Sequence, residues 1–271
     1  MKKLKEQIEN AWDNRELLKS QKTIDAINIV IDQLDSGNLR VSEPTENGWI
    51  LYEWIKKAVV MYFPTRESET LFAGPMEFHD KLKLKTGYAK KGIRVVPHAI
   101  ARYGSFIDRD VILMPSYVNI GAYVGSRTMI DTWATVGSCA QIGSDVHISG
   151  GVGIGGVLEP LQASPVLIED GAFIGSRCII VEGVHIGKEA VLGANVVLTS
   201  STKIFDVSGE KTIEFKGKIP PRSVVIPGNT KKNFPAGEFQ VPCALIIGKR
   251  KKSTNLKTSL NDALRNFSLA I

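Results

Sequence analysis

The first residues that can do chemistry are a carboxylate and an indole two positions apart, in the run Met-Ile-Asp-Thr-Trp-Ala-Thr-Val-Gly over 129–137. A carboxylate beside an outward-facing Trp133 can orient an amine and accept its proton. The residues alone leave a second interpretation of Asp131 open, that of a turn residue tolerating a left-handed backbone.

Four arginines in or beside this region are candidates for binding the carboxylates of a substrate, because a guanidinium can hold a carboxylate in a bidentate pair. Each of them could equally be a solvated charge. They are Arg94, Arg102, Arg127 and Arg177.

The four histidines form no pair with the local spacing of metal ligands, so we expect no metal site. His147 and His185 are candidates for a general base, although a structural role with a hydrogen-bond partner is the more frequent one. His79 and His98 lie outside the regular part of the chain or at its edge. The cysteines are three and far apart, which indicates reduced thiols.

The elements that must position these residues follow from a period of six. One column of aliphatic or aromatic residues recurs at every sixth position, with a single interruption. The column comprises Ile100, Phe106, Ile112, Val118, Val124, Ile130, Val136, Ile142, Ile148 and Ile154, then Ile168, Ile174, Ile180, Ile186, Leu192, Leu198 and Ile204.

The position after this column is often Gly, and the fourth position after it is usually small. Hexads of this kind predict a parallel β-helix, in which the aliphatic residue points inward and stacks on its equivalents in the neighbouring coils. A helix period of 3.6 or a strand period of 2 would not keep such a column in phase. Asp131 stands in a slot that Gly usually takes, and Trp133 should face out of the wall.

Two segments interrupt the hexads. Residues 155–165 carry two prolines and predict a loop projecting from the coils, of the kind that often carries function. Residues 206–218 contain Ser208-Gly209 between short β-prone runs and predict a hairpin excursion.

The chain on either side of the repeat is different. We expect helices over 1–36, with Thr23 as an N-cap and Gly37 as the stop, then a strand at 49–52 and a helix that Pro64 ends. After the repeat we expect a strand at 241–247 and a helix at 258–267. The predicted domains are therefore 1–93, helical; 94–230, β-helix; and 231–271, a C-terminal strand and helix extension.

Composition excludes several classes. The 271 residues are 43% hydrophobic and 23% charged, with no apolar run near 18 residues, and the charged N-terminus lacks a signal-peptide core. We therefore expect a cytoplasmic protein with no membrane contact. The net charge of +6 includes basic clusters within 81–94 and from Lys249 to Lys252. These clusters fit a solvated face or a polyanionic small ligand better than nucleic acid, for which no motif is present.

Longer stretches resemble one family, the tetrahydrodipicolinate N-succinyltransferases. The resemblance rests on Arg94–Pro97, Leu113–Val124, Asp131–Gly143 and Gly150–Ala163, and on Leu34–Val41 and Trp54–Val59 in the helical part. It implies a mainly β fold with a left-handed coil, assembled as a homotrimer whose active sites lie between neighbouring prisms. It also implies succinyl transfer from succinyl-CoA, as cosubstrate and with no permanent cofactor, to the amino group of ring-opened tetrahydrodipicolinate in diaminopimelate and lysine biosynthesis.

The resemblance assigns roles to residues. Arg94 and Asp131 match substrate-binding positions, and Asp131 is expected to hold the amine and take its proton; Trp133 and Arg102 are further candidates for the substrate. Pantetheine should lie along the wall beneath the 150–163 loop. The candidate residues for the coenzyme are Gly150, Gly151, Gly155, Gly156, Ala163 and Lys249.

One departure bears on the acid or base. Where many members of the family have a catalytic Glu, this chain has Ile179, and Glu182 is offset along the strand, so that Asp131 is the stronger candidate and Glu182 the weaker. Three alternatives stay open at this point. They are an acetyl-CoA-dependent hexapeptide acyltransferase with a His base, a zinc-dependent γ-type carbonic anhydrase, and a non-catalytic β-helix scaffold.

Overall fold

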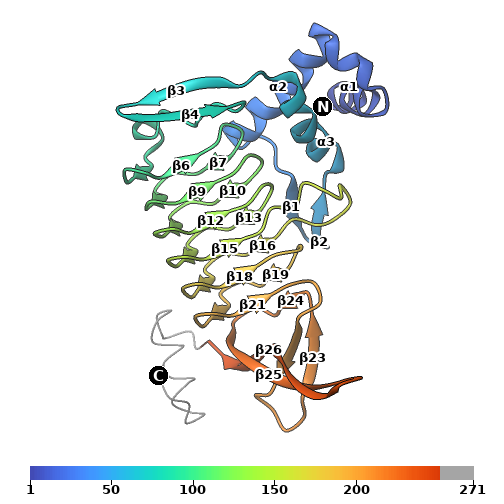
Figure 1. Ribbon diagram of the computed structural model, residues 1–271, viewed down its shortest axis with the longest axis vertical. Helices are drawn as coiled ribbons and strands as arrows, with labels where there is room; N and C mark the ends of the chain where they lie inside the picture. Colours follow the sequence, from blue (N-terminus) through green and yellow to red (C-terminus); the bar gives the residue numbers. More distant parts are fainter. Residues whose placement is uncertain (251–271) are drawn as a thin grey trace.

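The computed structural model describes residues 1–250, which form three parts along one long axis (Figure 1). A helical unit lies at one end, a prism of short parallel strands forms the middle, and a long antiparallel hairpin lies at the other end. The parallel β-helix is therefore confirmed, whereas the left-handed sense remains a prediction from the resemblance. The predicted helix at 258–267 lies outside the described residues.

The predicted N-terminal helices are present as α1 (Lys2–Asp13), α2 (Gln21–Ser36) and α3 (Glu53–Tyr62), with short 3-10 turns at η1 (Arg15–Lys19) and η2 (Phe63–Thr65). Gly37 ends α2 with a left-handed φ of 78°, as predicted. The N-cap prediction at Thr23 is wrong. Ser20 is the N-cap, because the N–H groups of Thr23 and Ile24 already donate to the Ser20 carbonyl.

The helices bury one apolar cluster that continues into the prism. Ile27 and Ile31 of α2 and Ile55 of α3 pack in this cluster together with Ile120 and Cys139 of the coils. The helical unit therefore docks on the prism through a shared core. The hairpin of β1 (Ser42–Thr45) and β2 (Gly48–Leu51) confirms the strand predicted near Trp49, and it lies along the flank of the prism (Figure 1).

A second hairpin was not predicted. β3 (Glu69–Ala73) and β4 (Met76–Asp80) pair antiparallel about a turn at Gly74 and Pro75. Nearly all of its residues are exposed, so the alternation of Met76, Glu77, Phe78 and His79 in β4 does not correspond to a buried face and a solvent face. The 3-10 turn η3 (Ala89–Lys91) then leads into the first coil.

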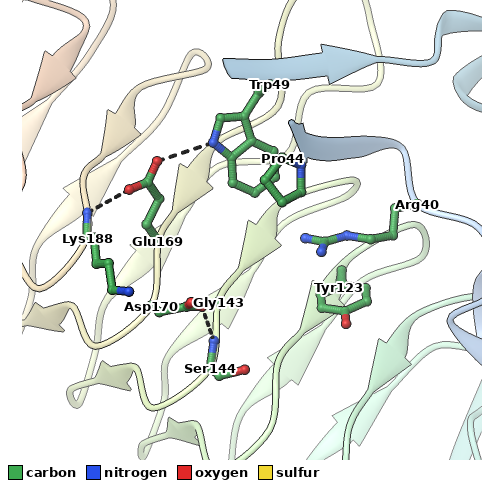
Figure 2. A pocket seen from close by; sticks show the side chains of 9 residues that line it. All are labelled: Arg40, Pro44, Trp49, Tyr123, Gly143, Ser144, Glu169, Asp170 and Lys188. Atoms are coloured by element: carbon green, nitrogen blue, oxygen red, sulfur yellow. Dashed lines mark hydrogen bonds between the residues drawn. The ribbon is translucent and has the colours of Figure 1, made fainter. Parts of the chain in front are cut away.

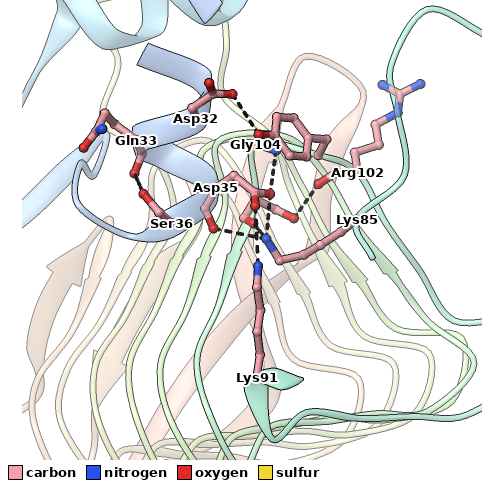
Figure 3. A network of polar contacts seen from close by, with 10 residues as sticks. Asp32, Gln33, Asp35, Ser36, Lys85, Lys91, Arg102 and Gly104 are labelled. Carbon is pink, nitrogen blue, oxygen red and sulfur yellow. Dashed lines mark hydrogen bonds and ion pairs between the residues drawn. The ribbon is translucent and has the colours of Figure 1, made fainter. Parts of the chain in front are cut away.

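A buried ion pair fastens α2 to the first coil (Figure 3). The ammonium of Lys85, which is 3% exposed, donates to Asp35 Oδ1 at 2.6 Å and to the carbonyl oxygens of Asp35 and Ser105 at 3.1 and 2.8 Å. The N–H of Gly104 donates to the same carboxylate oxygen at 3.0 Å. One carboxylate thus joins three segments that are distant in the sequence.

The prism has three sides, each a stack of two-residue strands. The β7 side comprises β7 (Phe106–Ile107), β10 (Tyr123–Val124), β13 (Gln141–Ile142), β16 (Leu167–Ile168), β19 (His185–Ile186) and β24 (Lys218–Ile219). The β8 side comprises β5 (Arg94–Val95), β8 (Ile112–Leu113), β11 (Met129–Ile130), β14 (His147–Ile148), β17 (Phe173–Ile174) and β20 (Val191–Leu192). The β9 side comprises β6 (Ile100–Ala101), β9 (Tyr117–Val118), β12 (Thr135–Val136), β15 (Gly153–Ile154), β18 (Ile179–Ile180) and β21 (Val197–Leu198).

The predicted inward column is confirmed from Val118 onward, where each member is buried. It is wrong by one residue in the first coil: Ala101, Ile107 and Leu113 point inward, and Ile100, Phe106 and Ile112 point outward. The side from Leu113 to Val118 has five residues where a regular side has six. Apolar residues stand at both positions of these strands, so the hexads alone did not reveal the shift.

The loop predicted over 155–165 is confirmed. Ile154 and Ile168 are consecutive inward positions on adjacent sides, so 14 residues replace the six of a regular side rather than the 12 of two sides. The excursion after Ile204 is also confirmed as a hairpin, of β22 (Lys203–Asp206) with β23 (Ile213–Lys216).

The C-terminal hairpin comprises β25 (Ser223–Phe234) and β26 (Gly237–Lys249), and it contains the strand predicted at 241–247. β25 begins in the prism, where Val224 pairs with Val191 of β20, and continues beyond it. The proposed domain division at 230/231 falls within β25, and that at 93/94 immediately precedes β5.

Candidate active site

The corner between the β8 and β9 sides presents the carboxylate of Asp131. The backbone N–H of Asp131 donates to the Ile148 carbonyl at 2.9 Å, which continues the ladder of β11. Its Oδ1 accepts from the N–H and hydroxyl of Thr132 at 2.7 and 3.2 Å. Oδ2 has no hydrogen-bond partner within residues 1–250. The side chain is thus fixed in orientation, with one oxygen available to an amine.

The left-handed turn at this corner is made by Trp133, which has a φ of 61°, and not by Asp131. The turn interpretation of Asp131 is therefore wrong in its left-handed form. The N–H of Trp133 donates to the Pro115 carbonyl at 2.6 Å, and the indole is 73% exposed, as expected for an outward residue. Asp131 and Trp133 are adjacent features of one exposed edge.

Two glycines of the next coil lie over this edge. Gly151 has a φ of 70°, and its N–H donates to the Thr132 carbonyl at 2.9 Å. A Cβ at Gly151 would lie 3.3 Å from Cγ of Arg177, whose own N–H donates to the Gly150 carbonyl. The glycines leave a strip without side chains between Trp133 and Arg177. We call Asp131, Trp133, Gly150, Gly151 and Arg177 the Asp131 corner.

Arg94 lies on the same side of the prism as Asp131. Arg94 of β5 pairs with Ile112, which pairs with Met129, so Arg94 is two coils away from β11, the strand that precedes Asp131. At about 4.8 Å between strands, this is a separation of roughly 10 Å. The Arg94 side chain is exposed and has no side-chain partner among residues 1–250, so the structure places an available cation and an oriented carboxylate along one face.

Arg102 and Glu182 lie at the other corner of the β9 side, and not at the Asp131 corner. The guanidinium of Arg102 pairs with Asp80 at 2.8 Å and contacts Asn119 at 3.4 Å. Glu182 is exposed, and its Oε2 accepts from the N–H and hydroxyl of Ser200, which lowers the pKa of the Glu182 carboxyl. One full side separates both residues from Asp131 within a single chain.

Ile179 points outward on β18 between Gly153 and Val197, and it is 38% exposed. The position where the resemblance expects a catalytic Glu is thus an exposed apolar residue on the β9 side. Lys249 lies near the far end of the prism, where its ammonium donates to Ser223 Oγ at 2.9 Å and to the Pro221 carbonyl at 3.2 Å.

The loop after Ile154 has an anchor that sequence reasoning missed. Lys56 of α3 is fully buried, and its ammonium donates to the carbonyl oxygens of Pro160 and Ala163 at 3.1 and 3.0 Å. Burial lowers the pKa of Lys56, with weaker opposing effects from Cys139 and Glu53. No local pattern could reveal this contact, because its partners lie more than 100 residues away in the sequence.

Replacing Lys56 by Met should release this loop. Two loop carbonyls would lose a charged donor, and each such hydrogen bond contributes about 1.5–3 kcal/mol. The resemblance places pantetheine beneath this loop, and on that expectation the KM for the acyl thioester should rise about tenfold or more, with a smaller change in kcat. The half-exposed neighbour Lys57, changed to Met, is the matched control in steady-state kinetics. An unchanged KM in the Lys56 variant would separate the loop from thioester binding.

Three of the four histidines have structural partners. The ring of His147 stacks on Phe173 with centroids 5.0 Å apart, and burial lowers the pKa of His147 while Asp131 opposes the shift. His185 Nε2 lies 2.7 Å from Glu169 Oε1. His79 Nδ1 lies 3.0 Å from the hydroxyl of Thr70. No group of three or more potential metal ligands is present in the part of the chain that the structure describes.

Glu169 links the prism to the β1–β2 hairpin. Its carboxylate contacts the ring of His185 and accepts from the indole N–H of Trp49 at 3.3 Å and from the backbone N–H of Lys188 at 2.8 Å. These contacts, above all the one with His185, lower the pKa of Glu169 to about 2. The ionised Glu169 therefore stabilises the folded protein fully at a pH above its unfolded-state pKa near 4.5, and this contribution is lost as the pH falls towards 2.

Replacing Glu169 by Gln should consequently lower the free energy of unfolding by about 2–3 kcal/mol at pH 7. The difference from the parent protein should shrink between pH 4.5 and pH 2. Urea unfolding at a series of pH values measures it, with the exposed Glu67 changed to Gln as the control. A pH-independent difference would contradict the ionic origin of the effect.

Comparisons with known proteins agree over most of the chain. Residues 3–65 match the family model "Tetrahydrodipicolinate N-succinyltransferase N-terminal", and residues 165–200 match "Hexapeptide repeat of succinyl-transferase". A 2,3,4,5-tetrahydropyridine-2,6-dicarboxylate N-succinyltransferase of Dechloromonas aromatica is 49% identical over 95% of this chain and 97% of its own length. The protein of the same name from Acinetobacter baylyi is 46% identical over 98% of this chain and 99% of its own length. No helix within residues 1–250 is long and apolar enough to cross a membrane.

Proposed function

This chain belongs to the tetrahydrodipicolinate N-succinyltransferase family, and from that premise we infer that it transfers the succinyl group of succinyl-CoA to the amino group of ring-opened tetrahydrodipicolinate. The reaction is a step of diaminopimelate and lysine biosynthesis. The observation that carries the proposal is the similarity to named succinyltransferases over nearly the full length of both chains. This similarity favours an acyltransferase over a carbonic anhydrase or a non-catalytic scaffold.

In the proposed mechanism the amine attacks the thioester carbonyl directly. Oδ2 of Asp131 accepts a hydrogen bond from the amine and assists its deprotonation, while Thr132 holds the other oxygen. A backbone N–H of the glycine-rich wall stabilises the oxyanion, and the CoA thiolate leaves. Trp133 contacts the body of the substrate. Holding both substrates together would supply much of the acceleration, up to ~7–11 kcal/mol in favourable systems.

Arg94 is proposed to hold a carboxylate of the substrate. The acceptor named for the relatives carries carboxylates at positions 2 and 6, so its open form has charges at both ends of a chain. The separation of roughly 10 Å between the strands of Arg94 and Asp131 suits an acceptor of this length, given the reach of an arginine. Arg102 is a second candidate for the substrate if its pair with Asp80 opens.

The pantetheine arm is proposed to run along the strip at Gly150 and Gly151 and under the loop that Lys56 anchors. Gly155, Gly156 and Ala163 belong to that loop, and Lys249 is a candidate partner for the phosphates farther along the prism. Succinyl-CoA is a cosubstrate and leaves as CoA after each turnover.

A homotrimer in the cytoplasm is proposed as the working form, with active sites between neighbouring left-handed prisms. Apolar side chains on the β9 side support a contact between subunits, since Ile179 and Val197 are 38% and 47% exposed in the single chain. Such packing would let Glu182 of a neighbouring subunit approach an Asp131 corner. We assign Glu182 a smaller part in catalysis than Asp131, because one of its carboxylate oxygens already accepts two hydrogen bonds from Ser200.

A CoA-release assay with tetrahydrodipicolinate and either succinyl-CoA or acetyl-CoA tests the proposal. We expect kcat/KM to be at least about 100-fold higher with succinyl-CoA, since a site built for a carboxylate rejects an analogue that lacks it. Equal rates with both donors, or faster release with acetyl-CoA, would overturn the choice of donor. Absence of release with either donor would overturn the proposed activity.

A further inference from the structure

A second pocket lies away from the Asp131 corner, where the N-terminal hairpin meets the prism (Figure 2). Its volume is about 300 Å³, at the lower end of the range for small-molecule sites. Its walls come from Arg40, from the β1–β2 hairpin and from four successive coils of the prism. We call it the Arg40 pocket.

Arg40 presents an anion-binding group that is already oriented. Its Nε donates to Oε1 of the buried Gln141 at 3.0 Å, and its guanidinium stacks over the ring of Tyr123 at 3.6 Å. The two terminal nitrogens have no hydrogen-bond partner within the described residues. A guanidinium fixed by stacking and by Nε retains its bidentate edge for a carboxylate.

The opposite wall carries one charge of each sign. Asp170 Oδ1 accepts from the Ser144 N–H at 2.8 Å, which fixes the carboxylate, while Oδ2 has no partner among residues 1–250. The ammonium of Lys188 lies beside Asp170, across the pocket from Arg40 (Figure 2). A neighbouring carboxylate and ammonium match the two charges of an α-amino acid head group.

The remaining walls add shape rather than charge. Trp49 and Pro44 supply apolar surface between the two ends of the pocket. Glu169 also lines it, but its oxygens already accept from Trp49, His185 and Lys188. The groups whose hydrogen-bonding atoms are still available are therefore two cations and one carboxylate, and with Glu169 included the four charges of the lining sum to zero.

We propose that the Arg40 pocket binds an α-amino dicarboxylic acid, whose distal carboxylate pairs with Arg40 and whose amino acid head group pairs with Asp170 and Lys188. Each charged group of such a ligand meets one available group of opposite charge: Arg40 for the distal carboxylate, Lys188 for the α-carboxylate and Asp170 for the ammonium. Its aliphatic chain lies against Trp49 and Pro44. This site is independent of the succinyl-transfer site, since it opens on the β7 side at its corner with the β8 side.

Titration calorimetry with three six-carbon probes tests the proposal in the absence of any thioester. L-2-Aminoadipate has all three charges, L-norleucine lacks the distal carboxylate, and adipate lacks the ammonium group. We expect L-2-aminoadipate to bind about 10- to 100-fold more tightly than either of the others. Equal binding of adipate would overturn the role of Asp170, and equal binding of L-norleucine would overturn that of Arg40.

Three variants, two at arginines and one at a lysine, test whether L-2-aminoadipate binds in the Arg40 pocket. Arg40→Met should weaken L-2-aminoadipate by about 10- to 100-fold and leave L-norleucine within about threefold, whereas Lys188→Ala should weaken both. Arg94→Met, which alters the proposed succinyl-transfer site, should leave unchanged the component of L-2-aminoadipate binding that Arg40→Met removes. Loss in the Arg94 variant with retention in the Arg40 variant would overturn the site. Lys188 is exposed, so its replacement should not affect folding, and the Lys188 variant tests the site even if Arg40→Met does not fold.

Discussion

Replacement of Asp131 by Asn is expected to lower kcat by about 10²- to 10⁴-fold, the usual range for a general base. Asn keeps the shape of the side chain and can still accept from the Thr132 N–H with its carbonyl oxygen. It removes the negative charge and the free carboxylate oxygen that would receive a proton from the amine. Initial rates of CoA release at saturating concentrations of both substrates measure the effect.

Glu182→Gln is the matched control for this experiment. Glu182 is exposed and already accepts two hydrogen bonds from Ser200, so we expect its variant to lose no more than about tenfold in kcat. Binding of both substrates to the Asp131 variant should be confirmed by calorimetry. Near-normal turnover with both substrates bound would remove Asp131 from the chemistry, and a larger loss in the Glu182 variant would exchange the two roles.

The largest expected effect on stability is that of Asp35→Asn, at about 3–5 kcal/mol of unfolding free energy. The ammonium of Lys85 would lose the carboxylate with which it pairs, and burial already lowers the pKa of Lys85 to about 8 against the opposing effect of Asp35. Raising the pH above about 8 neutralises Lys85, so the difference between variant and parent should shrink there.

Asp32→Asn on the same helix is the matched control, because Asp32 is exposed and accepts only from the Tyr103 hydroxyl among the described residues. Urea unfolding of both variants gives the comparison. A double variant with Asp35→Asn and Lys85→Met should recover part of the loss, since it removes the unpaired buried charge. A double variant no more stable than Asp35→Asn alone would contradict the electrostatic origin of the loss.

The hexads were sufficient to predict the prism, because a repeated inward residue is a property of each coil and needs no distant partner. They could not place the first coil correctly. Phe106 and Ile107 are both apolar, and so are Ile112 and Leu113, so either member of each pair could have pointed inward. Phe106 instead packs outside against Tyr123, and a Cβ on Gly37 would clash with its ring.

The Asp131 corner could be predicted from residues within one coil and the next. Lys56 and Arg40 could not, because their partners lie about 100 residues away. The β3–β4 hairpin was missed for a different reason: its two strands are local partners, but both are exposed and only β4 alternates apolar and polar residues. Local sequence thus predicted the wall and its irregular positions, while the contacts that brace the wall arise from the docking of the N-terminal unit.

The distance between the charges of Arg94 and Asp131 is fixed by the stacking of three strands, since β5 pairs with β8 and β8 pairs with β11. Each coil adds about 4.8 Å, so the separation changes only in whole coils and not gradually. Insertion of one additional 18-residue unit between β8 and β11 would lengthen it to roughly 14 Å while leaving each charged side chain in its own local setting. A stacked repeat can in this way change the length of the acceptor it measures by adding or removing coils, without altering the residues that do the chemistry.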